Sequence, residues 1–258
     1  DPNYFSVLQL VSLAYFSRTK KINTLLKSGA VLFIVMSIFA SSSKTGLVTL
    51  FCYLMFSVVE YLIKKKKKLS TFIAQLFFII LLVATVPVVL SIIQSLTNYL
   101  ITIFPTFERV QIVFTDFDVA LSRGGSGRDL TWKTALEIIK VSPILGIGLG
   151  TYSGFAKHFF GIGSIAHNTY LQLTVEWGLL LAIFFFTYLF YVISKAIFSR
   201  NTNGELDVIL RDILIIFLIG SLAISLNNAR PFWLVLGAFM VNTQMISYKK
   251  NACKKLSS

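Results

Sequence analysis

The sequence has little charge, only two cysteines and only two histidines, and each shortage excludes a class of protein. Asp, Glu, Lys and Arg make up 14% of the 258 residues, against about 25% in a soluble domain, so the chain could not cover a soluble surface. Cys52 lies in an apolar run and Cys253 in a basic tail, which predicts no disulfide framework. His158 and His167 lack the Cys or carboxylate spacing of a metal site, and we expect neither a metal nor another cofactor.

Acidic residues are few: the sequence has 11 Asp and Glu but 24 Lys and Arg, which gives a formal net charge of +13. Such an excess can indicate a nucleic-acid-binding face, but this sequence has no basic domain to form one. The basic residues instead form short runs between apolar stretches, as is typical of anchors beside a lipid bilayer. The chain also lacks an initiator Met and a signal peptide, so we expect it to be part of a longer protein that continues upstream.

Apolar residues, in contrast, are abundant: 55% of the sequence is hydrophobic, and Phe alone occurs 24 times. A helix needs about 20 apolar residues to cross a bilayer, and seven stretches are candidates. They are residues 3–17, 28–43, 46–63, 70–93, 168–193, 210–228 and 231–247. The predicted fold class is therefore all-α, a polytopic transmembrane helix bundle of about seven spans. Short turns between spans two and three, and between spans six and seven, predict two antiparallel hairpins.

The placement of Lys and Arg predicts the orientation, because cytoplasmic loops are enriched in basic residues. Most of the basic residues fall on one side of the bilayer if the spans alternate: Arg18, Lys20, Lys21, Lys27, Lys64–Lys68, Lys195, Arg200, Arg211, Lys249, Lys250, Lys254 and Lys255. We assign that side to the cytoplasm. The chain is then organised as four spans in 1–93, a large external catalytic loop in 94–167, and three spans with a cytoplasmic tail in 168–258.

The external loop is far longer than a connector, and ordered segments of this length usually carry function. The segment from Ser126 to Asp129 has the form of a capping box and predicts a helix over about 127–140, with Pro143 beyond its end. Three glycines follow at alternate positions in 146–150. Their spacing differs from a dinucleotide fingerprint and no βαβ unit surrounds them, so a tight turn that lets backbone approach backbone is the better interpretation.

Two segments on the external side offer positive charge. Lys44 lies in a Ser-Lys-Thr-Gly turn, where it either binds an anion or snorkels at a hairpin tip. Arg128 follows a glycine-rich run at the start of the predicted helix, where backbone N–H groups, the helix dipole and a guanidinium can together bind phosphate. The alternative is a glycine hinge in which Arg128 pairs with Asp129 or Glu137.

His167 lies at the external mouth of the span that begins at residue 168. An imidazole there titrates near neutral pH and can act as a base or as a hydrogen-bond donor, whereas His158 has no comparable setting. Glu176 is an acid inside the same span. Nine helical steps place it on the opposite face from His167, so we do not expect the two side chains to cooperate directly.

Taken together, these motifs resemble the bacterial O-antigen ligase/polymerase superfamily of membrane glycan polymerases. The resemblance covers nearly the whole chain and rests on the order of its motifs: Asp1-Pro-Asn3, Ser43 to Gly46, Gly127-Arg128 with Trp132, Pro143 to Gly150, and His167-Asn168 to Gly178. Two positions depart from the family. Lys44 stands where Arg is common and lacks its bidentate fork, and Leu181 stands where ligases carry a small residue or Tyr, which favours a polymerase.

The resemblance implies a metal-independent glycosyltransferase in the bacterial cytoplasmic membrane, with its active face outside the cytoplasm. Its donor and acceptor would be undecaprenyl-diphosphate-linked oligosaccharides, and its partners the bilayer and other polysaccharide-assembly proteins. Arg128 and Lys44 would stabilise the departing diphosphate, and His167 would orient or deprotonate the acceptor hydroxyl. The remaining expected substrate contacts are Arg123, Asn168, Tyr170 and Arg230, with Tyr152 beside Tyr170 in a sugar groove.

Two other functions remain open on the sequence. A transporter or flippase of the same lipid-linked glycan should show internal repeats and broken helices with polar residues near the bilayer midplane. Here most of the polar candidates gather at one external face, which favours an enzyme. A non-catalytic scaffold of a polysaccharide-assembly complex would not need the motifs of the external loop.

Overall fold

The computed structural model describes residues 1–41, 43–64, 95–96, 98–104, 128–198 and 204–256. All regular structure in these ranges is helical, which confirms the predicted all-α class. The elements are α1 (Pro2–Arg18), α2 (Thr24–Ala40), α3 (Lys44–Lys64), α7 (Arg128–Val141), α8 (Tyr152–Phe160), α9 (Thr169–Phe198), α10 (Glu205–Gly220), the 3-10 helix η2 (Leu226–Asn228) and α11 (Arg230–Leu256). The span expected at 70–93 and the capping residue Ser126 lie outside the described ranges.

The predicted spans within the described ranges coincide with helices, but the helices differ in length and apolarity. Among them, α9 alone is long and apolar enough to cross a membrane, with 30 residues, and α2 is a shorter apolar helix. The helices α1 and α10 have only 17 and 16 residues. In the segment predicted to be an external loop, α7 confirms the helix predicted over 127–140, and α8 is a short helix of nine residues.

The predicted span 210–228 is misplaced, because α10 begins at Glu205 and ends at Gly220. The prediction of the orientation also counted Arg211 among the basic residues of a cytoplasmic loop. Arg211 instead lies within α10 with 0% of its side chain exposed, and its guanidinium pairs with Glu60 of α3 at 2.5 Å. A charge that is compensated in this way can be buried inside a helix bundle.

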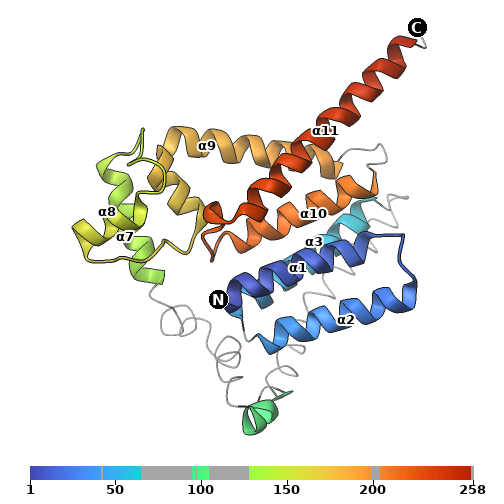
Figure 1. The fold of residues 1–258 in the computed structure, drawn as a ribbon, viewed down its shortest axis with the longest axis horizontal. Coiled ribbons are helices and arrows are strands. Elements are labelled where there is room, and N and C mark those ends of the chain that lie inside the picture. Colours follow the sequence, from blue (N-terminus) through green and yellow to red (C-terminus); the bar gives the residue numbers. More distant parts are fainter. Residues whose placement is uncertain (42, 65–94, 97, 105–127, 199–203, 257–258) are drawn as a thin grey trace.

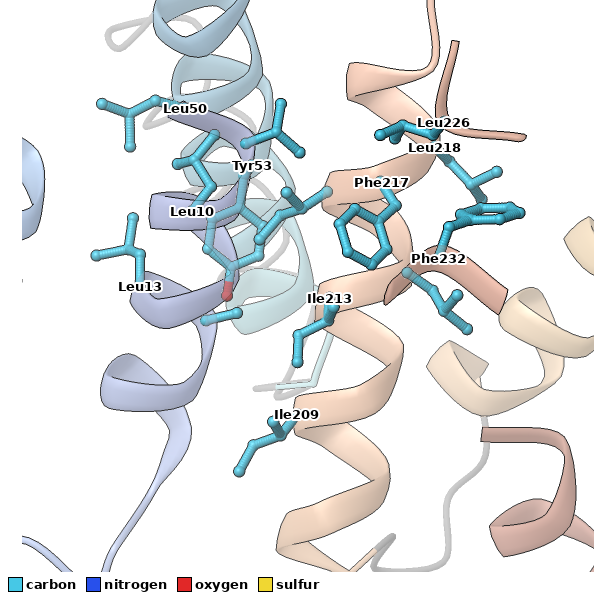
Figure 2. Close-up of a cluster of buried hydrophobic side chains, with 14 of the residues drawn as sticks. Leu10, Leu13, Leu50, Tyr53, Ile209, Ile213, Phe217, Leu218, Leu226 and Phe232 are labelled. Carbon is cyan, nitrogen blue, oxygen red and sulfur yellow. The ribbon is translucent and has the colours of Figure 1, made fainter. Parts of the chain in front are cut away.

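The main core lies between α1, α3, α10 and the start of α11. Figure 1 shows α1, α2, α3 and α10 side by side, and Figure 2 shows the apolar side chains between them. They include Leu10, Leu13, Leu50, Ile213, Phe217, Leu218 and Phe232. The helices α1 and α3 approach closely because Gly46 has no side chain, and a Cβ at Gly46 would overlap the Cβ of Ser6. This packing fixes the start of α3, which carries Lys44.

A second, smaller core joins α7 and α8 to the first part of α9, and Figure 1 shows this unit at one end of α9. Its buried members are Ala135, Ile138, Tyr152, Ala156, Ala166 and Val175. Tyr152 is completely buried, and its hydroxyl donates to the carbonyl oxygen of Thr131 at 2.9 Å. Tyr152 is therefore a core residue and does not line a sugar groove as expected.

Candidate active site

The helix α9 is broken at Gly178, whose backbone leaves the helical region with φ 78° and ψ 165°. A break frees backbone groups, which must find partners within the protein when the helix lies in a membrane. The segment that follows α7 supplies these partners. The N–H of Ile147 donates to the carbonyl of Val175 and the N–H of Gly148 donates to the carbonyl of Glu176, both at 3.0 Å. In the opposite direction, the N–H of Leu179 donates to the carbonyl of Pro143 at 2.7 Å.

Two glycines make this contact between α9 and the segment that follows α7 possible. Gly146 and Gly178 both have positive φ, 69° and 78°. A Cβ on Gly146 would lie 2.5 Å from the carbonyl oxygen of Glu176, and a Cβ on Gly178 would overlap the carbonyl oxygen of Ile144. The prediction that the glycine-rich run brings backbone against backbone is therefore confirmed. Its partner is the broken helix that begins two residues after His167.

His167 itself lies in the left-handed region with φ 50°, which residues other than glycine rarely adopt. Such a conformation costs about 1–3 kcal/mol and persists only where its surroundings enforce it. On one side, the hydroxyl of Thr131 in α7 donates to the carbonyl of Ala166 at 3.3 Å. On the other side, the N–H of Thr169 donates to the carbonyl of Ser221 at 2.9 Å. The backbone of His167 is thus held between α7 and the turn that follows α10.

Asn168 and Tyr170 hold the start of α9 in place. The side-chain oxygen of Asn168 accepts from the N–H of Leu171 at 3.0 Å, in the manner of an N-cap, and its amide nitrogen donates to the carbonyl of Leu222 at 3.2 Å. The hydroxyl of Tyr170 donates to the carbonyl of Leu218 at 2.9 Å. Both side chains therefore position the residues around His167, although the sequence suggested them as substrate contacts.

Arg128 begins α7 and meets the start of α3. A terminal nitrogen of its guanidinium lies 3.5 Å from the hydroxyl of Thr45, the residue after Lys44. Ser43 caps α3 by accepting an N–H of the first turn at 3.0 Å, and its hydroxyl donates to the side-chain oxygen of Asn3 at 2.8 Å. The structure therefore brings together the two segments that the sequence marked as positively charged.

Arg128 makes no ion pair with any residue that the structure describes. Of the partners considered for it, Glu137 pairs instead with Lys140 at 2.7 Å on the exposed side of α7, and Asp129 is exposed. The Nε of Arg128 is buried and has no hydrogen-bond partner. Because an unpaired buried N–H costs about 1–3 kcal/mol, the guanidinium has unused capacity to bind an anion.

Positive potential accumulates where α3 and α7 begin, since the N-terminal end of a helix dipole adds to the charges of Lys44 and Arg128. Burial lowers the pKa of Arg128, but a guanidinium stays protonated. Burial and, secondly, the charge of Arg128 lower the pKa of His167 from its ordinary value of 6.5. A lowered pKa favours the neutral form of the imidazole, which is the form that a general base requires.

The other basic residues and the second histidine are less closely connected to this site. Arg230 is exposed at the start of α11, next to the 221–229 segment that holds Thr169. Arg123 lies outside the described residues. His158 is exposed on α8, with its ring packed edge-on against a neighbouring Phe ring at 4.7 Å, and no contact described in the structure joins it to Arg128 or His167.

Glu176 is buried near the break in α9, where its carboxylate accepts a hydrogen bond from the amide of Gln172 at 3.2 Å. No described contact joins it to His167, in agreement with the helical-step argument. Glu176 lies at the edge of an open groove of about 620 Å³ that is otherwise largely apolar. The docked loop and the second part of α9 form its walls with Leu145, Gly148, Leu149, Trp177, Leu181, Phe184, Phe185 and Tyr188.

A charged cluster inside the α1–α3–α10 bundle was missed from the sequence. Arg18 lies 2.7 Å from Glu60 and 2.6 Å from Asp212, while Arg211 lies 2.5 Å from Glu60 and 2.6 Å from Asp212. The hydroxyl of Tyr53 donates to Asp212 at 2.9 Å. The signal that could have found this cluster is the presence of two acids, Glu60 and Asp212, within otherwise apolar stretches.

Comparison with known proteins places these features in a family. The sequence profile of the family described as O-antigen ligase matches residues 29–186, more than half of the chain. The chain belongs to the O-antigen ligase family. No curated protein and no solved structure matches it. The matched segment runs from α2 into α9 and contains Lys44, Arg128 and His167, so this O-antigen ligase family member is a membrane protein of polysaccharide assembly whose matched region includes the candidate site.

Proposed function

We propose that the protein is a membrane glycosyltransferase that joins undecaprenyl-diphosphate-linked oligosaccharides at the outer face of the cytoplasmic membrane. Membership of the O-antigen ligase family supports lipid-linked glycans as the substrate class. Polymerisation of repeat units is favoured over ligation because Leu181 replaces the small residue or Tyr that ligases carry. The observation that carries the proposal is that α7 joins the site residues: Arg128 at its start contacts Thr45 beside Lys44, and Thr131 one turn later holds the carbonyl of Ala166 next to His167.

The reaction forms one glycosidic bond and breaks the bond between the donor sugar and its diphosphate. A hydroxyl of the acceptor sugar attacks the anomeric carbon, His167 takes the proton of that hydroxyl, and the bonding electron pair leaves with undecaprenyl diphosphate. Negative charge grows on the departing oxygens as the bond breaks. Arg128, Lys44 and the N-terminal ends of α3 and α7 stabilise this charge, because fixed donors and dipoles act strongly in a site from which water is partly excluded.

The break in α9 is a feature that a transporter would also show. In transporters the unwound backbone coordinates the transported ion or substrate. Here the carbonyls before Gly178 accept hydrogen bonds from Ile147 and Gly148, so the protein itself occupies them. The break therefore serves to attach the external loop to α9, which supports an enzyme built around that loop over a flippase.

The test replaces each site residue in the full-length protein and measures glycan chain length in cells that lack the native gene. We expect His167→Ala and Arg128→Ala to reduce chain extension at least about 100-fold, since loss of a general base or of an oxyanion contact has effects of this size. His158→Ala is the matched control and should support wild-type glycan, because His158 is exposed and outside the site. Wild-type chain length in both site variants, at normal protein levels, would eliminate the proposal.

A second measurement separates the enzyme from a flippase. Protein solubilised in detergent does not separate two compartments, so transport cannot be detected in that preparation. A glycosyltransferase should still release undecaprenyl diphosphate from its donor in detergent, and the His167→Ala protein should not. Absence of this release from wild-type protein that is active in membranes would favour the transporter.

A further inference from the structure

Two buried nitrogen donors without partners lie one helical turn apart on α7. The Nε of Arg128 and the Nε1 of Trp132 are both buried, and neither has a hydrogen-bond partner among the residues that the structure describes. Side chains at positions i and i+4 of a helix lie on the same face, one above the other. The two donors therefore occupy adjacent places on one strip of α7.

This strip borders the buried face of α7. Thr131, Thr134, Ala135 and Ile138 are buried against α8 and α9, while the positions on the far side of the helix, among them Lys133 and Glu137, are exposed. Arg128 and Trp132 are half-buried and lie between these two faces. The strip therefore lies at the border of the buried face, where both side chains remain partly exposed although their unpaired nitrogen atoms are buried.

The chemistry of the strip selects the ligand. Each unpaired buried N–H costs about 1–3 kcal/mol, a cost that disappears once an acceptor binds. Both groups are donors only, one of them is cationic, and Arg128 has no acidic partner among the described residues. An acceptor with at least two oxygens and negative charge fits this pair, and the phosphate groups of a lipid diphosphate have this character.

We propose that the indole N–H of Trp132 and the Nε–H of Arg128 together bind oxygens of the donor's diphosphate. This inference rests on the proposed function and adds Trp132 as a second side chain that binds the leaving group. The diphosphate then lies along the first turns of α7, with its oxygens held by an indole and a guanidinium. The sugar that it carries extends toward His167, which is fixed near this helix through the bond from Thr131 to Ala166.

Trp177 offers a contrast within the same protein. Its Nε1 is also buried without a partner, but its ring packs against Phe185 and Trp233, at 5.3 and 6.3 Å between ring centroids. It also lines the largely apolar groove beside α9. With no cation described next to it, Trp177 presents an unpaired N–H without the charge that would attract a diphosphate.

The experiment measures binding of undecaprenyl diphosphate to purified full-length protein in detergent. Trp132→Phe keeps an aromatic ring and removes the N–H. We expect it to weaken binding about tenfold or more, the usual effect of losing a hydrogen bond to a charged group. Trp132→His keeps a ring N–H and should recover part of the affinity. Trp177→Phe removes the other unpaired indole N–H and should bind like the wild type. Thermal unfolding of each variant confirms that it is folded.

Three outcomes decide between the possibilities. Wild-type affinity of Trp132→Phe together with weak binding of Arg128→Gln would overturn the role of Trp132 and leave the proposed function intact. Wild-type affinity of both variants would overturn the inference and the proposed function together. Equal competition by inorganic diphosphate or by vesicles of phosphatidylglycerol would show a general phosphate surface and would also overturn the inference, because a site for the lipid-linked donor must prefer undecaprenyl diphosphate.

Discussion

The N–H of Leu179 donates to the carbonyl oxygen of Pro143 at 2.7 Å, and this bond joins the loop that follows α7 to α9 across the helix break. Backbone groups rather than side chains make the attachment, so it depends on close approach of two chain segments. The same loop is continuous with α7, which carries Arg128, and the same helix begins next to His167. The break at Gly178 therefore helps to fix the two proposed reacting groups relative to one another.

Replacement of Gly178 by Ala should disrupt this attachment. The residue has a φ of 78°, and a Cβ would overlap the carbonyl of Ile144, so we expect a loss of at least about 2 kcal/mol in stability, measured by thermal unfolding in detergent. Gly154→Ala is the control. Gly154 lies in α8 with open space around its Cβ position, and Ala there should be neutral or stabilising by up to about 1 kcal/mol. Equal melting of the two variants would contradict the role of the break.

The pKa of His167 should lie below 6.5 and should rise when Arg128 is replaced by Gln. Burial and the charge of Arg128 both lower this pKa, and Gln removes only the second cause, so the rise should be partial. His158→Gln leaves His167 as the one histidine of the 258 residues. NMR of histidine-labelled protein that carries this substitution therefore reports the titration of His167 alone. Lys140→Gln removes a charge from the exposed side of α7 and should leave the pKa unchanged.

The same shift gives a pH dependence with a defined sign. Because the pKa of His167 is lower in the folded state than in the unfolded state, the unfolded state binds the proton more readily. The contribution of His167 to stability is therefore complete above pH 6.5 and is lost as the pH falls through the folded-state pKa. Activity should fall over the same acidic range, since a protonated imidazole cannot accept the acceptor's proton.

Local signals in the sequence predicted the parts of the fold that local chemistry determines. The helix over 127–140 was found because polar residues precede it, its last turn carries Lys140 and Pro143 lies beyond it. The start of α10 was missed because the charged residues Glu205 and Asp207 of its first turn look like loop residues. Arg211 was counted with a cytoplasmic loop because its partner was unknown. Glu60, which pairs with Arg211, is far away in the sequence, and no local pattern reveals that pairing.

The candidate site shows the same limit. The residue types at Lys44, Arg128 and His167 predicted cationic and basic chemistry, but the sequence alone could not show that Arg128 contacts Thr45. The break in α9 was also hidden, because Gly178 lies in a continuous apolar run and the segment that docks there is distant in the chain. The order of the family motifs indicated that these residues act together, without showing how.

The predicted orientation of the chain determines which residues we expect to be accessible from outside the cell. In a protein without Cys52 and Cys253, a cysteine in place of Lys140 on α7 should react with an impermeant thiol reagent in intact cells. A cysteine in place of Lys21, which follows α1, should react only after lysis. Both positions are exposed, so burial does not confuse the comparison. The reverse pattern would place the site in the cytoplasm and contradict the proposed reaction at the outer face.

The buried charged cluster predicts a large loss of stability when one partner is removed. Arg211 and Asp212 are fully buried, and Glu60 is 3% exposed. Arg211→Met removes one of the two guanidinium groups that the structure describes beside Glu60 and Asp212, which should cost about 3–5 kcal/mol. Lys140→Met, which breaks the exposed pair with Glu137, should cost less than about 1 kcal/mol. Thermal unfolding of both variants in the same detergent makes the comparison.

A double variant distinguishes lost charge balance from lost packing in this cluster. Arg211→Met combined with Glu60→Gln removes one positive and one negative charge, and leaves Arg18 paired with Asp212 at 2.6 Å. If the cost of Arg211→Met comes from an uncompensated carboxylate, the double variant should be more stable than Arg211→Met alone. If the cost comes from the packing of the guanidinium over the Phe56 ring, at 5.6 Å from its centroid, the second substitution should bring no recovery. We expect the recovery, because the double variant removes one acid and one base and so keeps the positive and negative charges of the described cluster equal in number.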